Sequence, residues 1–271
     1  MLDLVVDSVR STLGANEPPA APFGVAGRAS WLLSRVLREA HEARHPASRL
    51  STVPGRARML QRLSLDVCRS HAIEPTVVGA FPAGPCVIVA NHLSYIEPIA
   101  ISSIRACVPI AKGEVAEWPL IGSTMRQLGI LFVRRGDASS GARVLKRALH
   151  VLRLGVPVLN FPEGTTTTGA GVGRFRRGVF GLARIARVPV VPVAVELESP
   201  ELCWVGGAAL LPHYLRTASR STISLKLRVG RALDPSRFAH ASALAEEARQ
   251  RILATLSGSG HENSVLAAGR N

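Results

Sequence analysis

Residues 86–98 read CVIVANHLSYIEP, and this stretch predicts how the chain folds. Its first five residues are apolar, which is typical of a short buried strand. The strand ends at Asn91 and His92, and Pro98 favours the first position of a helix, so Glu97 is expected at the helix N-cap. In an open α/β sheet, ligands bind at the carboxyl ends of the strands, where this polar loop is expected to lie.

Strand-like and helix-like segments alternate along most of the chain. Strands are predicted at 76–78, 86–90, 130–133, 156–161, 188–195 and 222–229, and helices at 98–106, 139–153, 176–186 and 241–256. Such alternation is typical of strand–helix–strand units, whose strands are parallel. We therefore expect an α/β fold with a mixed, mainly parallel sheet flanked by helices.

Two cationic amphipathic helices are predicted before the first strand, at 27–45 and 55–72. Apolar residues such as Trp31 and Leu60 recur among arginines in both segments. Basic amphipathic helices can lie in a membrane interface, so we interpret residues 25–72 as an amphipathic helical membrane-associating region. The alternative is that both are ordinary helices that pack on the main domain.

The other boundaries follow from composition. Residues 1–24, which end in a proline- and alanine-rich stretch, are predicted to be a flexible N-terminal segment, and 259–271 a flexible tail. Residues 73–258 are expected to form the main domain. The longest uncharged stretch, 75–96, is interrupted by Pro82 and Pro85 and reads as strands rather than a membrane span. The N-terminus lacks the pattern of a secretory signal.

The charge of the chain is strongly positive. There are 33 lysines and arginines against 19 acidic residues, a formal net charge of +14, and only three are lysines: Lys112, Lys146 and Lys226. Such an excess indicates an anionic partner, such as nucleic acid, a phosphorylated substrate or an acidic membrane surface, although a GC-rich coding sequence also favours arginine. Aromatic residues make up only 4%, which weighs against single-strand nucleic-acid binding.

Redox and metal sites have little support in the sequence. The four cysteines, Cys68, Cys86, Cys107 and Cys203, have no CxxC spacing, and we expect reduced thiols. The histidines form no metal-ligand pattern, and no GxSxG, GxGxxG or P-loop motif is present.

His92 and Glu97 are candidates for a general-base pair. On one continuous helix, five positions turn by about 500°, so the two side chains would diverge. They can meet if His92 lies in the loop and Glu97 at the start of the next helix. The carboxylate would then orient the imidazole and raise its basicity. The alternative is a surface histidine beside a glutamate that only complements a helix dipole.

Three further blocks also coincide with predicted strands. They are FVRR at 132–135, FPEGT at 161–165 and VPVVP at 188–192. Together with NHLSYIE at 91–97, in this order and spacing, they resemble the motifs of the glycerolipid acyltransferase family, the PlsC-like lysophosphatidic acid acyltransferases. The resemblance covers about 75–195, extends more weakly to about 230, and identifies 73–258 as an acyltransferase domain.

The resemblance implies roles for the first two blocks. His92 would deprotonate the acceptor hydroxyl as it attacks an acyl thioester, and Glu97 would orient His92, although the family usually has Asp there. Asn91 and Ser94 are expected to take part in substrate binding. Arg135, with Arg134 beside it, would bind the phosphate of the acceptor, because a guanidinium can hold two phosphate oxygens at once.

For the third block, the resemblance implies that Glu163, Gly164 and Thr165 bind the acceptor. Thr166 replaces an arginine that is frequent in the family, which leaves the acceptor head group open. Arg176, in the sequence GRFRRG at 173–178, stands at a basic position of the family and could restore a phosphate contact; alternatively it belongs to a solvated basic helix start. The fourth block is expected to be a buried strand that shapes the acyl pocket.

The implied reaction is acyl transfer from acyl-CoA or acyl-carrier protein to the free hydroxyl of a lysophospholipid, first of all 1-acylglycerol-3-phosphate, which gives phosphatidic acid. It needs no cofactor and no metal. We expect a peripheral or monotopic protein on the anionic, cytoplasmic face of a membrane. The alternatives are another lyso-lipid such as lyso-ornithine lipid, a non-lipid acceptor, or a catalytically weak lipid-binding homologue. No specific nucleic-acid partner is expected, since charge alone does not account for the four blocks.

Overall fold

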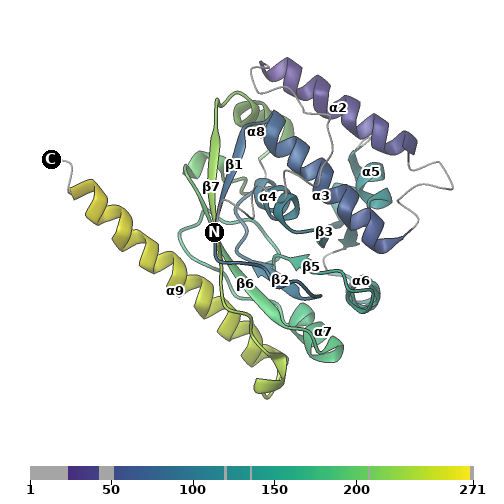
Figure 1. Cartoon of the computed structure of the whole chain (residues 1–271), viewed down its shortest axis with the longest axis vertical. Coiled ribbons are helices and arrows are strands. Elements are labelled where there is room, and N and C mark those ends of the chain that lie inside the picture. Colours follow the sequence, from purple (N-terminus) through teal and green to yellow (C-terminus); the bar gives the residue numbers. More distant parts are fainter. Residues whose placement is uncertain (1–23, 43–51, 119–120, 135, 207, 269–271) are drawn as a thin grey trace.

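A seven-stranded mixed sheet forms the centre of the computed structural model, which describes residues 24–42, 52–118, 121–134, 136–206 and 208–268 (Figure 1). The strands are β1 (Ile73–Val78), β2 (Val87–Ala90), β3 (Val108–Lys112), β4 (Leu131–Val133), β5 (Val158–Asn160), β6 (Val190–Leu197) and β7 (Ile223–Val229). Their order across the sheet is β1-β7-β6-β2-β5-β3-β4. β6, β2, β5, β3 and β4 run parallel to one another, whereas β7 is antiparallel to β6 and parallel to β1. The predicted mixed, mainly parallel α/β fold is confirmed.

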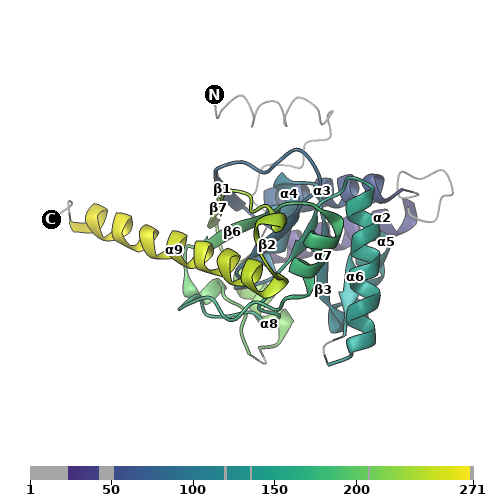
Figure 2. The same cartoon turned by 90° about the horizontal axis from the view of Figure 1, so that it is seen from below.

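The six predicted helices are present and differ from the prediction mainly at their ends, whereas the helices at 121–127 and 210–218 were not predicted. They are α2 (Val25–Glu42), α3 (Val53–Ser70), α4 (Ile96–Ile104), α5 (Ile121–Gln127), α6 (Ala138–Arg153), α7 (Gly178–Ala186), α8 (Leu210–Ala218) and α9 (Ala241–Ala268). α9 runs past the predicted boundary at 258, so residues 259–268, which we predicted as part of a flexible tail, are helical. Its C-terminal part extends away from the sheet (Figure 2). The predicted flexible segment 1–24 lies almost wholly outside the described residues.

The sheet is buried on both faces, which explains why its central strands are continuously apolar rather than alternating. Val87 and Val89 of β2 belong to a core formed with α6, α7 and α9. Ile88 and Ala90, which point to the opposite face, pack with α4 and the C-terminal end of α3. The helices therefore cover both faces, and the carboxyl end of β2 remains as the edge from which the Asn91–His92 loop emerges.

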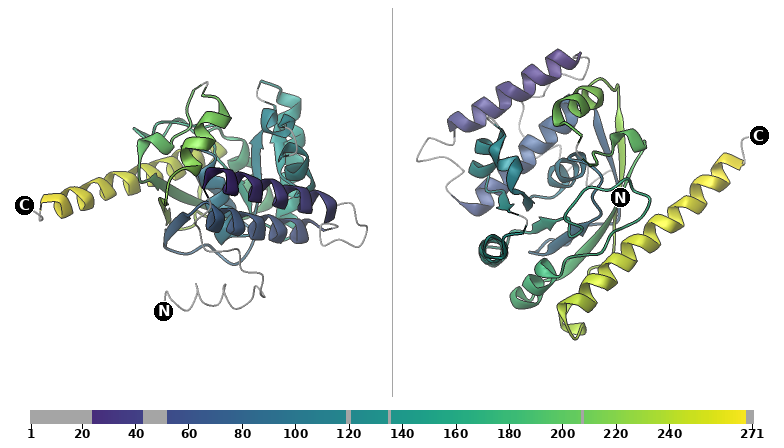
Figure 3. Two further views of the ribbon diagram at one scale, coloured as in Figure 1. Left: turned by 90° about the horizontal axis from the view of Figure 1, so that it is seen from above. Right: turned by 180° about the vertical axis from the view of Figure 1, so that it is seen from behind.

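The N-terminal helices α2 and α3 lie side by side against the sheet domain (Figure 3). α3 packs against α4 and buries an apolar stripe that includes Leu60, Leu63 and Val67. Helix α3 therefore packs on the main domain, which was the alternative to a membrane-associating helix in the sequence analysis.

Helix α2 is anchored by Arg28, which is only 5% exposed. Its guanidinium donates hydrogen bonds to the carbonyl oxygens of Ala218 (3.0 Å) and Arg220 (2.8 Å). Burial, and to a smaller extent the charge of Arg28, lowers the pKa of the neighbouring His71 to about 4, so this histidine is neutral near pH 7. Its Nε2 lies 3.0 Å from the Tyr214 hydroxyl. These contacts join α2 to the ends of α3 and α8.

Among the described residues, none of the helices combines the length and apolar character that crossing a bilayer requires.

Candidate active site

The loop that carries His92 runs from the end of β2 at Ala90 to the start of α4 at Ile96. The helix begins two residues before Pro98, and Tyr95 is its N-cap. Glu97 is therefore in the first turn of α4, and the prediction that it is the N-cap residue is wrong. Because the backbone of Tyr95 is already near-helical, the turn can begin before proline fixes its own φ angle.

Glu97 ties the loop together from inside the protein. Its side chain is fully buried, at 0% exposure. Its carboxylate accepts hydrogen bonds from the backbone N–H groups of Leu93 and Ser94, the latter at 2.7 and 2.9 Å. It thereby satisfies two backbone donors of the loop just before the helix, and it adds a negative charge at the positive end of α4.

The imidazole of His92 lies beside this carboxylate. Its Nδ1 is 3.6 Å from Glu97 Oε1, and its ring stacks on Phe161 with a centroid distance of 4.2 Å. Nδ1 has no hydrogen-bond partner within the described part of the chain, and the separation exceeds a normal hydrogen bond. The His92 side chain is 21% exposed, so the ring remains accessible from the other side. This is the geometry predicted for the pair: a loop histidine next to a carboxylate of the following helix.

The backbone of His92 is held by the FPEGT block. Glu163 Oε1 accepts the His92 N–H at 2.9 Å, while its Oε2 accepts the Gly173 N–H at 2.7 Å. The His92 carbonyl oxygen accepts the Thr167 N–H at 2.8 Å. We predicted acceptor binding for Glu163; in the structure the residue is only 8% exposed, and both of its carboxylate oxygens accept backbone hydrogen bonds. Thr167 and Gly173 were missed, although the threonine run at 165–168 marked the segment.

Asn91 has a structural function in place of the predicted substrate contact. Its side-chain amide donates to the Val195 carbonyl oxygen at 2.9 Å and accepts the Val195 N–H at 2.8 Å. These bonds continue the pairing of β2 with β6 beyond the end of β2, and Asn91 is only 2% exposed. Ser94 is also fully buried, and its hydroxyl has no partner among the described residues, so its side chain does not face solvent.

Replacing Asn91 by alanine is expected to lower the free energy of unfolding by about 2–4 kcal/mol, because it strands the buried N–H and C=O groups of Val195. Chemical denaturation followed by circular dichroism measures this. Asn160→Ala, at the end of β5, is the control and should cost less than about 1 kcal/mol. Equal losses in the two variants would contradict the assignment.

The remaining predicted residues of the FPEGT block lie beside the basic segment 173–178. Gly164 has a φ of +73°, and a Cβ there would come within 2.9 Å of Arg176 Nε. Only glycine suits both conditions. The Arg176 N–H donates to the Pro162 carbonyl oxygen at 3.0 Å, and the side chains of Arg176 and Thr165 are exposed. The structure therefore brings Arg176 to the block in which the sequence lacks its usual arginine.

The arginines of the FVRR block have a different position. Arg134 is exposed, and its backbone N–H donates to Ser140 Oγ at 3.0 Å. It follows the edge strand β4, which is separated from β2 by β5 and β3. Arg135 lies outside the described residues.

Aromatic side chains cover the loop from a segment that the sequence analysis did not single out. The backbone N–H of Trp204 donates to the Leu93 carbonyl oxygen at 2.8 Å. The Trp204 ring meets Tyr95 and Trp118 edge-on, with centroid distances of 5.9 and 6.1 Å. The only available signal was that tryptophan is scarce in this chain, with three residues in all. These rings therefore lie next to the loop that carries His92.

Cysteine chemistry is disfavoured in this site. Burial, and to a smaller extent the charge of Glu97, raises the pKa of the Cys203 thiol. Burial also raises the pKa of Cys68 and Cys86 to about 11 and that of Cys107 to about 12. Since the thiolate is the nucleophile, these shifts disfavour nucleophilic chemistry by the cysteines near neutral pH. Within the described ranges, no cluster of three His, Cys, Asp or Glu side chains could hold a metal ion.

The chain is similar to known acyltransferases. Residues 71–196 match the family model described as Acyltransferase. Over 210 residues, the chain is 30% identical to the lyso-ornithine lipid O-acyltransferase of Pseudomonas aeruginosa, covering 76% of this chain and 81% of that protein. It is 32% identical over 130 residues to the chloroplastic 1-acyl-sn-glycerol-3-phosphate acyltransferase BAT2 of Brassica napus, covering 48% of this chain and 38% of that protein.

A solved structure has the same fold. The crystal structure of the 1-acyl-sn-glycerophosphate (LPA) acyltransferase PlsC from Thermotoga maritima matches with a TM-score of 0.58 and 21% sequence identity. The match covers 86% of this chain and 88% of that chain, so it includes the helices around the sheet as well as the sheet itself.

Proposed function

This chain belongs to the acyltransferase family and is an O-acyltransferase, and we propose that it moves a fatty acyl group from an acyl thioester to the free hydroxyl of a lysophospholipid. The donor is acyl-CoA or acyl-carrier protein, and no further cofactor is required. The observation that carries the proposal is the pair of His92 and the buried Glu97, 3.6 Å apart at the carboxyl end of β2.

The mechanism starts with proton removal by His92. With Nδ1 next to Glu97, the neutral imidazole carries its proton on Nδ1 and offers Nε2 as a base. Nε2 takes the proton of the acceptor hydroxyl while its oxygen attacks the thioester carbon. The tetrahedral intermediate then breaks the C–S bond, and the imidazolium returns the proton to the thiolate. Glu97 stabilises the transient imidazolium, as in other base–carboxylate pairs.

The first candidate acceptor is 1-acylglycerol-3-phosphate. Arg176 supports it, because this exposed guanidinium lies against Gly164 and is suited to a phosphate. Lyso-ornithine lipid is the second candidate, since the relative that is matched over 81% of its length carries that name and Thr166 replaces an arginine. An ornithine lipid has an amino-acid head group in place of the phosphate, so the two can be separated by experiment.

An acyl-transfer assay tests the function itself. Purified protein is given palmitoyl-CoA alone, then with 1-acylglycerol-3-phosphate or lyso-ornithine lipid, and both thiol release and the acylated product are measured. We expect release that depends on the acceptor, and the better acceptor identifies the substrate. Acyl-carrier protein as donor is the parallel arm. No transfer with either donor and either acceptor, while vesicle binding persists, would favour a lipid-binding homologue instead.

Replacing Arg176 by alanine should raise the KM for 1-acylglycerol-3-phosphate roughly tenfold, because a charged hydrogen bond to phosphate is lost. The KM for lyso-ornithine lipid should stay nearly unchanged, and so should kcat for both. Arg177→Ala is the matched control, since its side chain is also exposed and makes no capping bond at α7. An equal effect of the two variants would contradict a phosphate contact by Arg176.

The acceptor lives in a bilayer, and the second part of the proposal is peripheral attachment to an anionic membrane surface on the cytoplasmic side. The helix α2 exposes Leu33, and the adjoining α8 exposes Leu211 (64%) and Leu215 (44%). Exposed leucines on adjoining helices, in a chain with a net charge of +14, suit shallow insertion among anionic head groups.

The double substitution Leu211→Asp and Leu215→Asp is expected to weaken binding to vesicles that contain anionic lipid at least about tenfold, because each leucine contributes roughly 1.5–3 kcal/mol on leaving water. Vesicle sedimentation measures it. Ile185→Asp is the control, since Ile185 is 69% exposed on α7. If the double variant sediments with vesicles as the wild type does, α8 is not part of the membrane-facing surface.

A further inference from the structure

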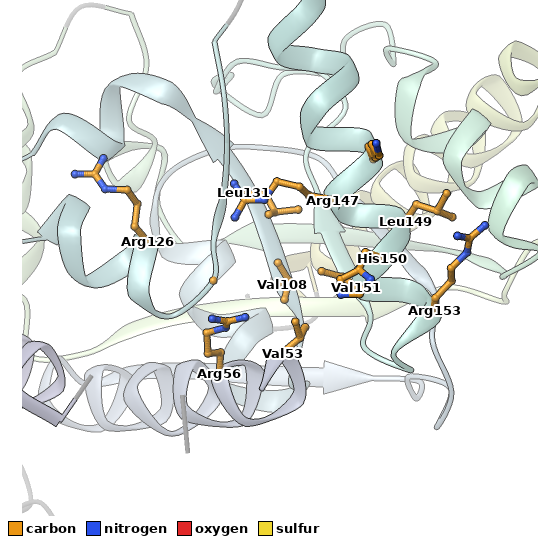
Figure 4. A pocket seen from close by; sticks show the side chains of 12 residues that line it. Val53, Arg56, Val108, Arg126, Leu131, Arg147, Leu149, His150, Val151 and Arg153 are labelled. Carbon is orange, nitrogen blue, oxygen red and sulfur yellow. The ribbon is translucent and has the colours of Figure 1, made fainter. Parts of the chain in front are cut away.

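A cavity of about 600 Å³ lies at the opposite end of the sheet from His92. Val108 and Leu131, which line it, stand at the amino ends of β3 and β4, whereas His92 follows the carboxyl end of the parallel strand β2. Residues from α3, α5 and the C-terminal half of α6 complete the lining (Figure 4). The cavity is therefore separate from the site of acyl transfer.

The lining is cationic and contains no carboxylate. Three helices supply five permanently charged side chains: Arg56 from α3, Arg126 from α5, and Lys146, Arg147 and Arg153 from α6. In Figure 4 the four arginines lie on different sides of the cavity, with Arg126 and Arg153 on opposite sides. None of the five forms an ion pair with an Asp or Glu among the residues that the structure describes. Their mutual repulsion is thus left uncompensated within this part of the protein.

Helix dipoles account for only some of these charges. Arg126 and Arg153 are in the last turns of their helices, where a cation is favourable. Arg56 is near the N-terminal end of α3, where the dipole disfavours a cation. Its Nε is buried and has no hydrogen-bond partner among the described residues. Arg56 as a whole is only partly buried, but this unpartnered donor, together with four other cations and no carboxylate in the lining, suits an anionic ligand.

We propose that this cavity binds a ligand that carries a phosphate group and an apolar part. Guanidinium groups from several directions are suited to phosphate oxygens. The aliphatic walls, among them Val108 and Leu131, are suited to an apolar part that a free phosphate ion lacks. Two sources share this chemistry: an anionic phospholipid and a soluble nucleotide phosphate. The proposal does not depend on the acyl-transfer reaction.

Isothermal titration of the full chain tests the proposal with soluble probes. They are dihexanoylphosphatidic acid for the lipid source, adenosine 3′,5′-bisphosphate for the nucleotide source and inorganic phosphate as the probe without an apolar part. We expect one organic probe to bind and phosphate to bind much more weakly. The probe that binds identifies the source. Binding of neither organic probe, or equal binding of phosphate, would overturn the proposal.

Matched variants locate the binding. Arg147→Ala with Arg153→Ala removes two exposed cations of the cavity, and Arg184→Ala with Arg231→Ala removes two exposed cations elsewhere. The cavity variant should lose about 100-fold in affinity, roughly tenfold for each charged contact, while the control variant keeps the wild-type affinity. Because the cavity is remote from His92, both should retain acyl transfer with saturating substrates. Equal loss in both variants would mean general charge attraction or binding in the catalytic site, and would overturn the proposal.

Discussion

Replacing His92 by alanine is expected to reduce kcat for acyl transfer by about 10³–10⁴-fold, because it removes the general base. The His92 ring makes no hydrogen bond to another residue of the described chain; its contacts are the stack on Phe161 and the proximity of Glu97. The backbone hydrogen bonds that the loop makes with Glu163, Thr167 and Glu97 do not use the imidazole. The variant should therefore fold and bind the acceptor normally.

The measurement is the initial rate of thiol release with saturating donor and acceptor, beside the thermal midpoint of unfolding. His150→Ala is the matched control, because His150 is exposed and lies in the remote cavity. It should leave the rate unchanged. A folded His92→Ala variant with a rate near that of wild type would exclude His92 as the base and, with it, the mechanism above.

The substitution Glu97→Gln should have the second largest effect, a fall in kcat of roughly 10²-fold. The amide has nearly the same shape, but it carries no charge to stabilise the His92 imidazolium. It also brings an NH₂ group toward the buried N–H groups of Leu93 and Ser94, which need acceptors. This mismatch should lower the free energy of unfolding by about 1–3 kcal/mol. Since Glu97 does not face the solvent, the KM for the acceptor should change little.

Glu97→Asp separates the charge from the geometry. It keeps the carboxylate but shortens the side chain by one methylene, and it restores the residue that is usual in the family. We expect activity within about tenfold of wild type, well above that of Glu97→Gln. A large gain would mean that the wild-type chain is a weakened enzyme. A loss as great as that of Glu97→Gln would show that placement of the carboxylate, rather than its charge, sets the rate.

Several features of the fold follow from local sequence. Apolar runs such as 86–90 predicted strands, and the amphipathic spacing at 139–153 predicted α6, because both patterns reflect the side-chain period of the element itself. β3 was missed because its sequence, VPIAK, is short and contains proline. α8 was missed because its nine residues contain Pro212 and lack a side-chain cap.

The candidate site shows the same division. That His92 would lie in a loop and Glu97 at the start of a helix was readable from the spacing of His, Glu and Pro within seven residues, 92–98. Three long-range contacts could not be read from the sequence. Asn91 hydrogen-bonds to Val195, Glu163 accepts the backbone N–H of His92, and the backbone N–H of Trp204 donates to Leu93. Asn91 and Val195 are 104 positions apart, and His92 and Glu163 are 71 apart.

The sequence by itself thus determined the α/β class, the strand-end position of the NHLSYIE block, and a loop position for His92 before a helix that begins near Glu97, because these depend on neighbours along the chain. Only the tertiary structure decided which polar side chains hydrogen-bond to the backbone around the loop and which remain exposed. It also decided that Arg56, Arg126 and Arg153 surround one cavity. The physical reason is that a hydrogen-bonding side chain finds its partner through strand order and register, which bring distant segments into contact and leave no local pattern in the sequence.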